Sequence, residues 1–160
     1  MAGKLGTGAS TITTRLARAK DLDAVARLFD LYRQFYQQPP DPKLAKRYLR
    51  ERFRKKQSAI YVAENAQGEI VGFTQLYPTF CSVRAAHTFV LYDLFVERAA
   101  RRTGAGRALM QAAEAHCRKK GAARMELSTA KTNIPGQTLY ESLAWIRDDA
   151  FYVYQKMLRT

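Results

Sequence analysis

A short basic loop carries the clearest chemical signal in the sequence. Gly104 and Gly106, separated by one residue, lie between an apolar run typical of a strand and a run typical of a helix. Glycines let the backbone pass close to a ligand, and the first N–H groups of a helix have no partner inside it. The helix dipole adds positive charge there, and so do four arginines, Arg98, Arg101, Arg102 and Arg107. The loop therefore predicts a phosphate or diphosphate site, the alternative being a plain glycine-rich turn.

Two common phosphate-binding motifs fit this loop poorly. A Walker loop needs a Gly-Lys-Ser/Thr ending, and the sequence contains none. A dinucleotide fingerprint needs a third glycine or alanine where Leu109 stands, although Glu126 lies about twenty residues on, where a ribose-binding acid would lie. Nucleotide hydrolysis is unsupported, and dinucleotide binding is weakly indicated.

The loop and the segments after it resemble the acetyl-CoA signature of the GCN5-related N-acetyltransferase (GNAT) superfamily. Val96, Arg101-x-x-Gly104-x-Gly106 and the helix that follows match the first part of this signature. Asn133, Leu139-Tyr140-Glu141 and Leu143-Ala144-Trp145 match its second part. The resemblance covers most of residues 11–158. The run Leu-Tyr-Asp-Leu-Phe-Val at residues 91–96 is similar to the branch that contains diamine, polyamine and certain amino-acid acetyltransferases.

The resemblance implies acetyl-CoA as a cosubstrate, held mainly by backbone groups. Pantetheine would bond to the backbone of Leu94 and Val96, and the N–H of Phe95 or Val96 would polarise the thioester carbonyl. Asn133 would contact the pantetheine arm, its alternative role being a helix cap before Pro135. The residues expected at the cofactor are Leu94, Phe95, Val96, Arg101, Arg102, Thr103, Gly104, Ala105, Gly106, Arg107 and Asn133.

Tyr140 and Asp93 are the candidate catalytic residues. A phenol stays protonated at neutral pH and can protonate a departing thiolate, so Tyr140 is the predicted general acid; its alternative role is that of a core aromatic. Asp93 is the carboxylate available to act as a base through water, but alternation along a strand allows it to point away from the cleft as a structural residue. Three further tyrosines, Tyr32, Tyr36 and Tyr77, are expected either to line the acceptor pocket or to lie in the core.

The composition indicates one domain without disulfides. A chain of 160 residues can bury most of its apolar surface without cross-links or metal. Cys81 and Cys117 have no His, Asp or Glu cluster at metal-ligand spacing, so we expect no metal. Cys117 falls on the apolar face of a predicted helix, and Cys81 falls in a predicted loop near Arg84, the cation that would have to favour its thiolate.

The net charge of +13, from 27 Lys and Arg against 14 Asp and Glu, is the strongest compositional signal. Much of it lies in residues 43–56, a predicted helix whose apolar stripe is Leu44, Tyr48, Leu49 and Phe53. The basic residues there form either a solvated helix face or a surface for nucleic acid or another polyanion. We expect no nucleic-acid partner, because the sequence contains no nucleic-acid-binding module or repeated aromatic platform.

Periodicity and turn residues predict alternating strands and helices. Strands are expected at residues 11–16, 59–63, 70–77, 88–96, 125–129 and 151–157, helices at 22–36, 43–56, 104–120 and 135–142, and a loop at 78–86. Their order predicts an α/β mixed sheet with helices on both faces. The resemblance adds that the sheet is mostly antiparallel and splayed at its central strand.

Residues 1–10 are expected to be a disordered leader and residues 11–160 a single N-acetyltransferase domain, in a cytoplasmic protein without a membrane span. The resemblance implies transfer of an acetyl group to the primary amine of a small molecule or amino acid, in a homodimer with residues 151–157 near its interface. Polyamines are doubtful acceptors, since polyamine acetyltransferases carry a glutamate where Tyr92 stands. The alternatives are a CoA-binding module without turnover and a basic nucleic-acid-associated module.

Overall fold

The computed structural model describes residues 11–158, so the predicted leader at residues 1–10 lies outside the described residues. The chain divides into two compact units, Met1–Ser128 and Thr129–Thr160, and each is described by itself. A single domain over residues 11–160 therefore stays a prediction.

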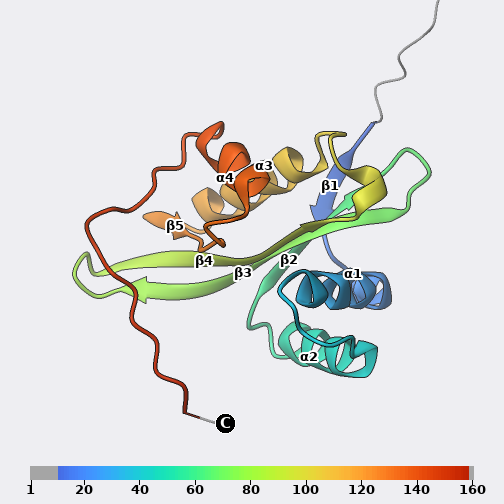
Figure 1. The fold of residues 1–160 in the computed structure, drawn as a ribbon, viewed down its shortest axis with the longest axis horizontal. Helices are drawn as coiled ribbons and strands as arrows, with labels where there is room; N and C mark the ends of the chain where they lie inside the picture. Colours follow the sequence, from blue (N-terminus) through green and yellow to red (C-terminus); the bar gives the residue numbers. More distant parts are fainter. Residues whose placement is uncertain (1–10, 159–160) are drawn as a thin grey trace, which may run out of the picture. The chain divides into compact units, whose positions relative to one another are not determined.

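The first unit is an α/β structure built on a five-stranded sheet (Figure 1). The strands follow one another in sheet order: β1 (Thr13–Leu16), β2 (Ala59–Glu64), β3 (Ile70–Cys81), β4 (Ala86–Val96) and β5 (Arg124–Glu126). Neighbours are antiparallel except β4 and β5, which are parallel. The helices α1 (Leu22–Phe35) and α2 (Pro42–Arg54) cover one face of the sheet, and α3 (Ala105–Lys119) covers the other. The predicted mixed, mostly antiparallel sheet with helices on both faces is confirmed.

Burial explains why α1 and α2 form where they do. Residues three and four positions apart on α1 are buried, as an amphipathic helix requires, and they include Leu22, Val25, Ala26 and Phe29. They share a core with Ala45 and Leu49 of α2 and with Phe73 of β3. The start of α2 is fixed by Asp41, whose Oδ1 accepts a 2.9 Å bond from the N–H of Leu44, and by Pro42 in the first turn.

The β3–β4 hairpin is longer than predicted. Residues 78–86, expected as a loop, are mostly paired: Pro78 lies opposite Phe89, and Cys81 lies opposite Ala86. The pairing of β3 with β2 ends at Leu76, so Pro78 stands on a stretch with one free edge, where a missing N–H is tolerated. Cys81 therefore lies at the end of a strand and not in a loop.

The sheet opens between β4 and β5. These strands pair only where Thr88–Val90 lies beside Arg124–Glu126. Beyond Val90, β4 continues to Val96 beside β3, while its other edge has no partner strand among the described residues of this unit. This opening is the splay expected of the central strand, and it leaves backbone N–H and C=O groups available to a ligand.

The second unit contains α4 (Ile134–Glu141), which begins and ends one residue earlier than the predicted span of 135–142. Residues 151–158 form neither helix nor strand, so the predicted strand at 151–157 is wrong. A strand needs a partner ladder, and none of the described residues pairs with this segment. Its large apolar side chains are exposed, among them Phe151, Tyr152, Val153, Tyr154 and Met157. Across residues 11–158, no helix is both long enough and apolar enough to cross a membrane.

Candidate active site

A bulge in β4 lies at the centre of the candidate site. In the pairing of β3 with β4, Gln75 lies opposite Asp93 and Leu76 lies opposite Leu91, so no residue of β3 lies opposite Tyr92. One strand thus carries an extra residue at this point, which bends it and redirects the side chains around it. The hydroxyl of Tyr32 on α1 stabilises the bulge by donating a 2.8 Å hydrogen bond to the backbone oxygen of Tyr92.

The bulge reverses the alternation of side chains along β4. Phe89 contacts the ring of His116 on α3, with 5.5 Å between ring centroids, whereas Phe95 packs against the core that contains α1. Under strict alternation these two residues would share a face. Because Tyr92 is the extra residue, Asp93 lies on the same face as Phe95 and points toward α1 and α2. The possibility that Asp93 points away from this cleft is thereby removed.

Asp93 is a buried carboxylate with a defined partner. Its side chain is 6% exposed, and its Oδ2 accepts a 2.7 Å bond from Nε2 of Gln75. Burial penalises the charged form and raises the pKa of Asp93 to about 6, while the bonds from Gln75 and Tyr32 act in the opposite direction. The carboxyl group therefore titrates close to neutral pH.

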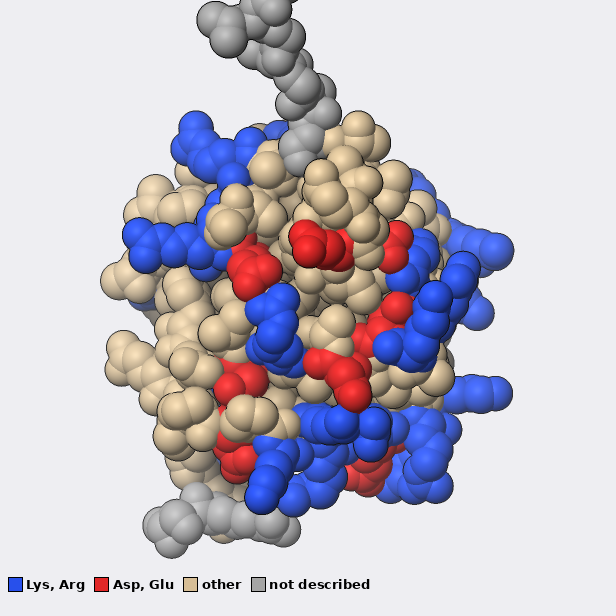
Figure 2. Space-filling model, turned by 90° about the vertical axis from the view of Figure 1, so that its right-hand side faces the viewer, with Lys and Arg blue, Asp and Glu red and all other residues tan. Residues whose placement is uncertain are grey.

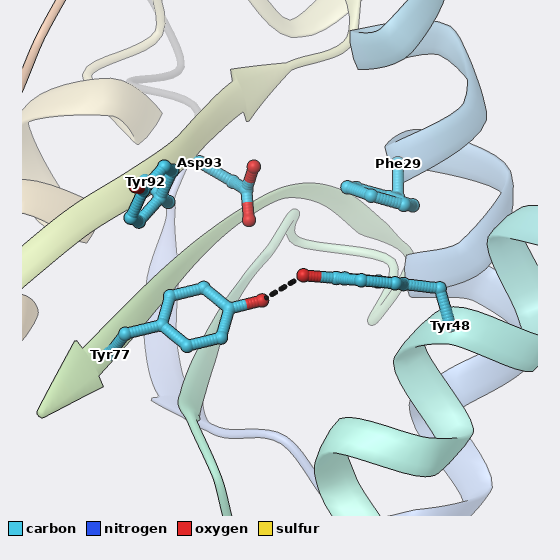
Figure 3. A pocket seen from close by; sticks show the side chains of 5 residues that line it. All are labelled: Phe29, Tyr48, Tyr77, Tyr92 and Asp93. Atoms are coloured by element: carbon cyan, nitrogen blue, oxygen red, sulfur yellow. Dashed lines mark hydrogen bonds between the residues drawn. The ribbon is translucent and has the colours of Figure 1, made fainter. Parts of the chain in front are cut away.

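Four aromatic rings surround this carboxylate in a pocket of about 170 Å³ (Figure 3). Phe29 of α1 stacks on Tyr48 of α2, with ring centroids 5.5 Å apart, and Tyr77 of β3 meets Tyr92 edge to face at 5.4 Å. Figure 3 shows the Asp93 carboxylate pointing between these two pairs of rings. Aromatic faces and a carboxylate together suit an ammonium group.

The hydroxyl groups of Tyr48 and Tyr77 join the two sides of the pocket. They lie 2.8 Å apart, and Figure 3 marks the hydrogen bond between them. Burial raises the pKa of Tyr77 well above its ordinary value, and the nearby Tyr48 and Asp93 add to the rise. The guanidinium of Arg52, 4.9 Å from the ring centroid of Tyr48, acts in the opposite direction. Tyr77 therefore remains a neutral phenol over the range in which Asp93 titrates.

The glycine loop follows the end of β4 and begins α3. Gly104 has a φ of +91°, a left-handed conformation that glycine adopts without strain, and Arg102 has a φ of 67°. Gly104 is the N-cap of α3, and no described side chain caps the helix there. The first N–H groups of α3 are thus left to a ligand, as an anion site requires. The hydroxyl of Thr103 donates a 2.7 Å bond to the oxygen of Ala100 and fixes the turn.

Basic side chains surround this helix terminus. Arg101 donates from Nε to the backbone oxygen of Val96 over 3.1 Å, and its guanidinium lies 5.9 Å from the ring centroid of Phe95. The remaining arginines of the predicted cluster, Arg98, Arg102 and Arg107, are exposed. The loop therefore has the positive charge and the backbone donors expected for a diphosphate.

The end of β4 packs tightly against its neighbours at Gly72. A Cβ atom on Gly72 would lie 2.9 Å from the backbone oxygen of Phe95 and 3.2 Å from side-chain atoms of Leu109 and Val96. Leu94 and Val96 pack on the α3 side with Ala105 and Leu109. Their side chains are partly buried against this cluster, and the backbone of β4 here borders the edge that has no partner strand among the described residues of this unit.

Asn133 and Tyr140 lie in the second unit, Asn133 as the N-cap of α4 and Tyr140 on that helix. Asn133 caps the helix: its Oδ1 accepts from the N–H of Gly136 at 3.3 Å, and its Nδ2 donates to Thr129 at 3.0 Å. The capping role that the sequence allowed is therefore present, and a role at the cofactor stays a prediction. Tyr140 is partly buried, and its ring centroid lies 6.3 Å from that of Trp145.

Among the predicted pocket tyrosines, Tyr77 lines the pocket, Tyr32 supports it through the bulge, and Tyr36 is an exposed residue that contacts the Tyr32 ring. Four residues of the site were not predicted from the sequence: Phe29, Tyr48, Gln75 and Tyr92. Phe29 and Tyr48 belong to apolar helix stripes that look like ordinary core. The polar Gln75 inside an apolar strand was a usable signal, since a buried amide needs partners.

The two cysteines are not part of this site. Cys117 is buried on α3, as its helical spacing predicted, and burial raises the pKa of its thiol to about 11. The neighbouring His116 lies against Tyr61, whose hydroxyl is 3.2 Å from Nδ1. Within residues 11–158, no group of three or more His, Cys, Asp and Glu side chains is arranged to hold a metal ion.

Comparisons with known proteins agree with this geometry. The sequence model of the acetyltransferase (GNAT) family matches residues 25–145. The chain is similar to YhfO, an uncharacterized N-acetyltransferase of Bacillus subtilis strain 168, with 41% identity over 140 residues, 88% of this chain and 93% of that protein. A probable acetyltransferase of Haemophilus influenzae is 29% identical over 94 residues, 59% of this chain and 64% of that protein.

Solved structures give the same result. The crystal structure of a probable acetyltransferase superposes with a TM-score of 0.85 at 34% identity, covering 94% of this chain and 99% of that chain. An aminoglycoside N-acetyltransferase, AAC(6')-Iy, crystallised with CoA, superposes with a TM-score of 0.77 over 92% of this chain and 95% of that chain. Its 17% identity supports a shared fold alone.

Proposed function

The chain belongs to the GNAT family of acetyltransferases, and we propose that it moves the acetyl group of acetyl-CoA to the primary amine of a small molecule or amino acid. The observation that carries the proposal is Asp93, a buried carboxylate in an aromatic pocket beside the open stretch of β4. An amine of pKa near 10 is almost wholly protonated at pH 7, so the enzyme must remove a proton before the amine can attack.

Asp93 is suited to remove that proton. With a pKa of about 6, it is mainly a carboxylate at neutral pH and still basic enough to hold a proton. Gln75 and Tyr32 bond to this carboxylate, and Figure 3 shows it pointing between the aromatic rings of the pocket, where an acceptor amine would lie. The rings of Phe29, Tyr48 and Tyr77 exclude water around the ammonium group and stabilise its charge until the proton is transferred.

The opposite side of the reaction uses the end of β4 and the start of α3. These residues fit acetyl-CoA, since the edge of β4 is open beyond Val90 and the N-terminus of α3 is uncapped among basic side chains. The backbone of Leu94 and Val96 would hold the pantetheine arm, and the N–H groups around Gly104 would hold the diphosphate. Acetyl-CoA supplies the thioester carbonyl that the amine attacks. Tyr140 would then donate its phenolic proton to the departing thiolate.

The pocket limits the size and charge of the acceptor. A cavity of about 150 Å³ holds one benzene molecule, so a pocket of about 170 Å³ admits a single ring or a short alkyl chain. The helix α2, which supplies Tyr48, carries six basic residues against one acidic residue. Figure 2 shows Lys and Arg gathered toward the bottom of the view, the level of α2 in Figure 1. This charge repels polycations, so polyamines and aminoglycosides are disfavoured relative to monoamines and amino acids.

A free-thiol release assay with a panel of amines tests the proposal. The panel contains arylalkylamines, amino acids, spermidine and an aminoglycoside, each with acetyl-CoA. We expect the fastest release with a monoamine or an amino acid. A melting-temperature rise with CoA but no release with any amine would support a CoA-binding module without turnover. Tight DNA binding with a steep salt dependence would support the nucleic-acid alternative.

We also propose that the enzyme is a homodimer with residues 151–157 near its interface. Phe151, Tyr152 and Tyr154 are at least 80% exposed, and covering such rings with a second copy removes apolar surface from water. Light scattering is expected to give twice the 18.2 kDa mass of one chain. A mass of one chain at all concentrations would contradict the proposal.

A further inference from the structure

A chain of three polar side chains runs beneath the pocket. Ser58, just before β2, donates from its hydroxyl to Oε1 of Gln75 over 2.7 Å. Nε2 of Gln75 in turn donates to Oδ2 of Asp93, also over 2.7 Å. Gln75 is fully buried, at 0% exposure, in the strand that faces Asp93 across the bulge. Burying an amide costs free energy unless its polar atoms are hydrogen-bonded. Here both the oxygen and the nitrogen of the amide have partners.

The charged carboxylate of Asp93 fixes the orientation of the Gln75 amide. A carboxylate can only accept, so the amide nitrogen must face Asp93 and the amide oxygen faces the hydroxyl of Ser58. The reversed amide would bring two oxygen acceptors, Oε1 of Gln75 and Oδ2 of Asp93, into contact. The bond from Ser58 satisfies the amide oxygen and so supports the orientation that stabilises the charged carboxylate.

We propose that Gln75, supported by Ser58, is a positioning residue for the acetyl transfer: it holds Oδ2 of Asp93 so that the carboxylate faces the acceptor amine, and it stabilises the charged carboxylate. The inference rests on the proposed function of Asp93. Gln75 lies below the pocket and is not among the residues that line it, so it acts on the acceptor only through Asp93.

A bond from Gln75 to the charged form of Asp93 has a measurable consequence. Such a bond favours the carboxylate over the carboxylic acid, and burial acts against it. Without Gln75, burial would act with less opposition, and the pKa of Asp93 would rise further. At neutral pH a larger fraction of the enzyme would then hold a protonated Asp93 that cannot accept a proton.

The other groups that face Asp93 do not mask its contribution to a pH profile of activity. They are Tyr32 from α1, Tyr48 and Arg52 from α2, Tyr77 from β3 and Tyr92 from β4. These side chains are phenols and one guanidinium; none is a carboxyl, an imidazole or a thiol, the groups whose ordinary pKa lies between about 4 and 9. The two histidines, His87 and His116, contact Phe89 on the α3 side of the sheet, opposite Asp93. The acid limb of a pH profile therefore reports on Asp93.

The test compares Gln75→Leu and Ser58→Ala with Thr74→Val. Thr74 is the neighbouring residue on β3, also 0% exposed, and its Oγ1 has no hydrogen-bond partner among the described residues, so Thr74→Val matches Gln75→Leu in burial and strand position. The measurement is kcat/KM against pH with the fastest amine of the panel. We expect Gln75→Leu to move the acid limb upward by about one pH unit and to lower kcat/KM at pH 7 at least tenfold. Ser58→Ala should act in the same direction with a smaller effect, and Thr74→Val should leave the limb in place.

Two further measurements separate positioning from structure. Gln75→Glu keeps the size of the side chain but places two carboxyl groups together; they share a proton, so activity should be lost at pH 7 and partly return at high pH. Folded Gln75 variants with an unmoved acid limb would overturn the inference.

If no amine supports turnover even in the parent enzyme, the proposed function fails. Titration of the Asp93 carboxyl carbon by NMR, in the parent and in Gln75→Leu, still decides whether Gln75 stabilises the carboxylate. An equal pKa in both proteins would refute it.

Discussion

The two ends of the candidate site are both attached to β4, but one is formed mainly by backbone groups and the other by side chains. The glycine loop after β4 offers backbone N–H groups and exposed arginines, with Gly104 in a left-handed conformation. The pocket at the bulge of β4 offers side chains: four aromatic rings and the buried carboxylate of Asp93. One end is positively charged, and the other is a half-open aromatic pocket with a carboxylate in it. The difference matches the two partners of the reaction, an anionic cofactor and a cationic amine.

The comparison also shows how each end can vary. A backbone site depends on conformation, so it requires glycine and tolerates exchange of many side chains around it. A side-chain site depends on the identity of each residue that lines it. Substitutions at the two ends should therefore have separable effects on the cofactor and on the acceptor.

The largest expected effect is at the pocket. Asp93→Asn keeps the shape of the side chain and removes the base, so kcat/KM for the amine should fall by about 10² to 10⁴. The melting-temperature rise caused by CoA should stay as in the parent, because the glycine loop is untouched. A loss of CoA binding in this variant would break the separation of the two ends. Turnover within threefold of the parent would exclude Asp93 as the base.

A second prediction concerns the proposed general acid, Tyr140. Tyr140→Phe removes one hydroxyl and keeps the ring, so turnover should fall about a hundredfold while CoA affinity stays near that of the parent. Single-turnover kinetics with saturating acetyl-CoA measures this. If the variant is as fast as the parent, the leaving thiolate obtains its proton from another group or from water.

A third prediction concerns the charge of the glycine loop. Replacing Arg101 and Arg102 by Gln should weaken CoA binding by about 1 to 3 kcal/mol, with a loss that shrinks as salt is added. Replacing Lys55 and Lys56, which follow α2, is the matched control and should change CoA binding little, because exposed charges beyond about 8 Å are screened at physiological salt. Calorimetric titration gives both values. Equal losses would mean that net charge, and not this loop, attracts CoA.

The smallest expected effect is a change of stability with pH. The pKa of Asp93 is about 6 in the folded chain against an ordinary value of 3.8, so its burial costs stability above pH 6 and costs nothing below pH 3.8. Asp93→Asn removes this cost, and its stability advantage over the parent should grow by about 1 kcal/mol between pH 5 and pH 8. Urea unfolding at both pH values measures it. An advantage that shrinks with rising pH would contradict the raised pKa.

The sequence predicted the end of the site that is made of backbone better than the end that is made of side chains. Gly104 and its arginines carry a local signal, because left-handed conformations and helix termini depend on neighbours in the chain. The order of helices and strands along the chain was predicted for the same reason, from periodicity within each segment. The wrong assignments, at residues 78–86 and 151–157, are those that depend on pairing between strands.

The pocket could not be read from the sequence because it depends on a pairing between distant strands. Nothing around Tyr92 marks it as an extra residue; the bulge exists only in the register of β4 against β3. Without it, alternation leaves the direction of Asp93 open. Phe29 and Tyr48 come from two helices, and their stacking follows from how those helices pack on the sheet.

The bulge also has a consequence for how acceptor range can evolve. Tyr92 lines the pocket, yet it is 64% exposed and lies outside the strand register, held there through its backbone oxygen. Its side chain can therefore be exchanged without breaking a ladder bond or opening a core cavity. Selection can alter the entrance to the pocket at this position while stability and the base stay as they are. Directed evolution toward new amines would begin with a full substitution library at Tyr92.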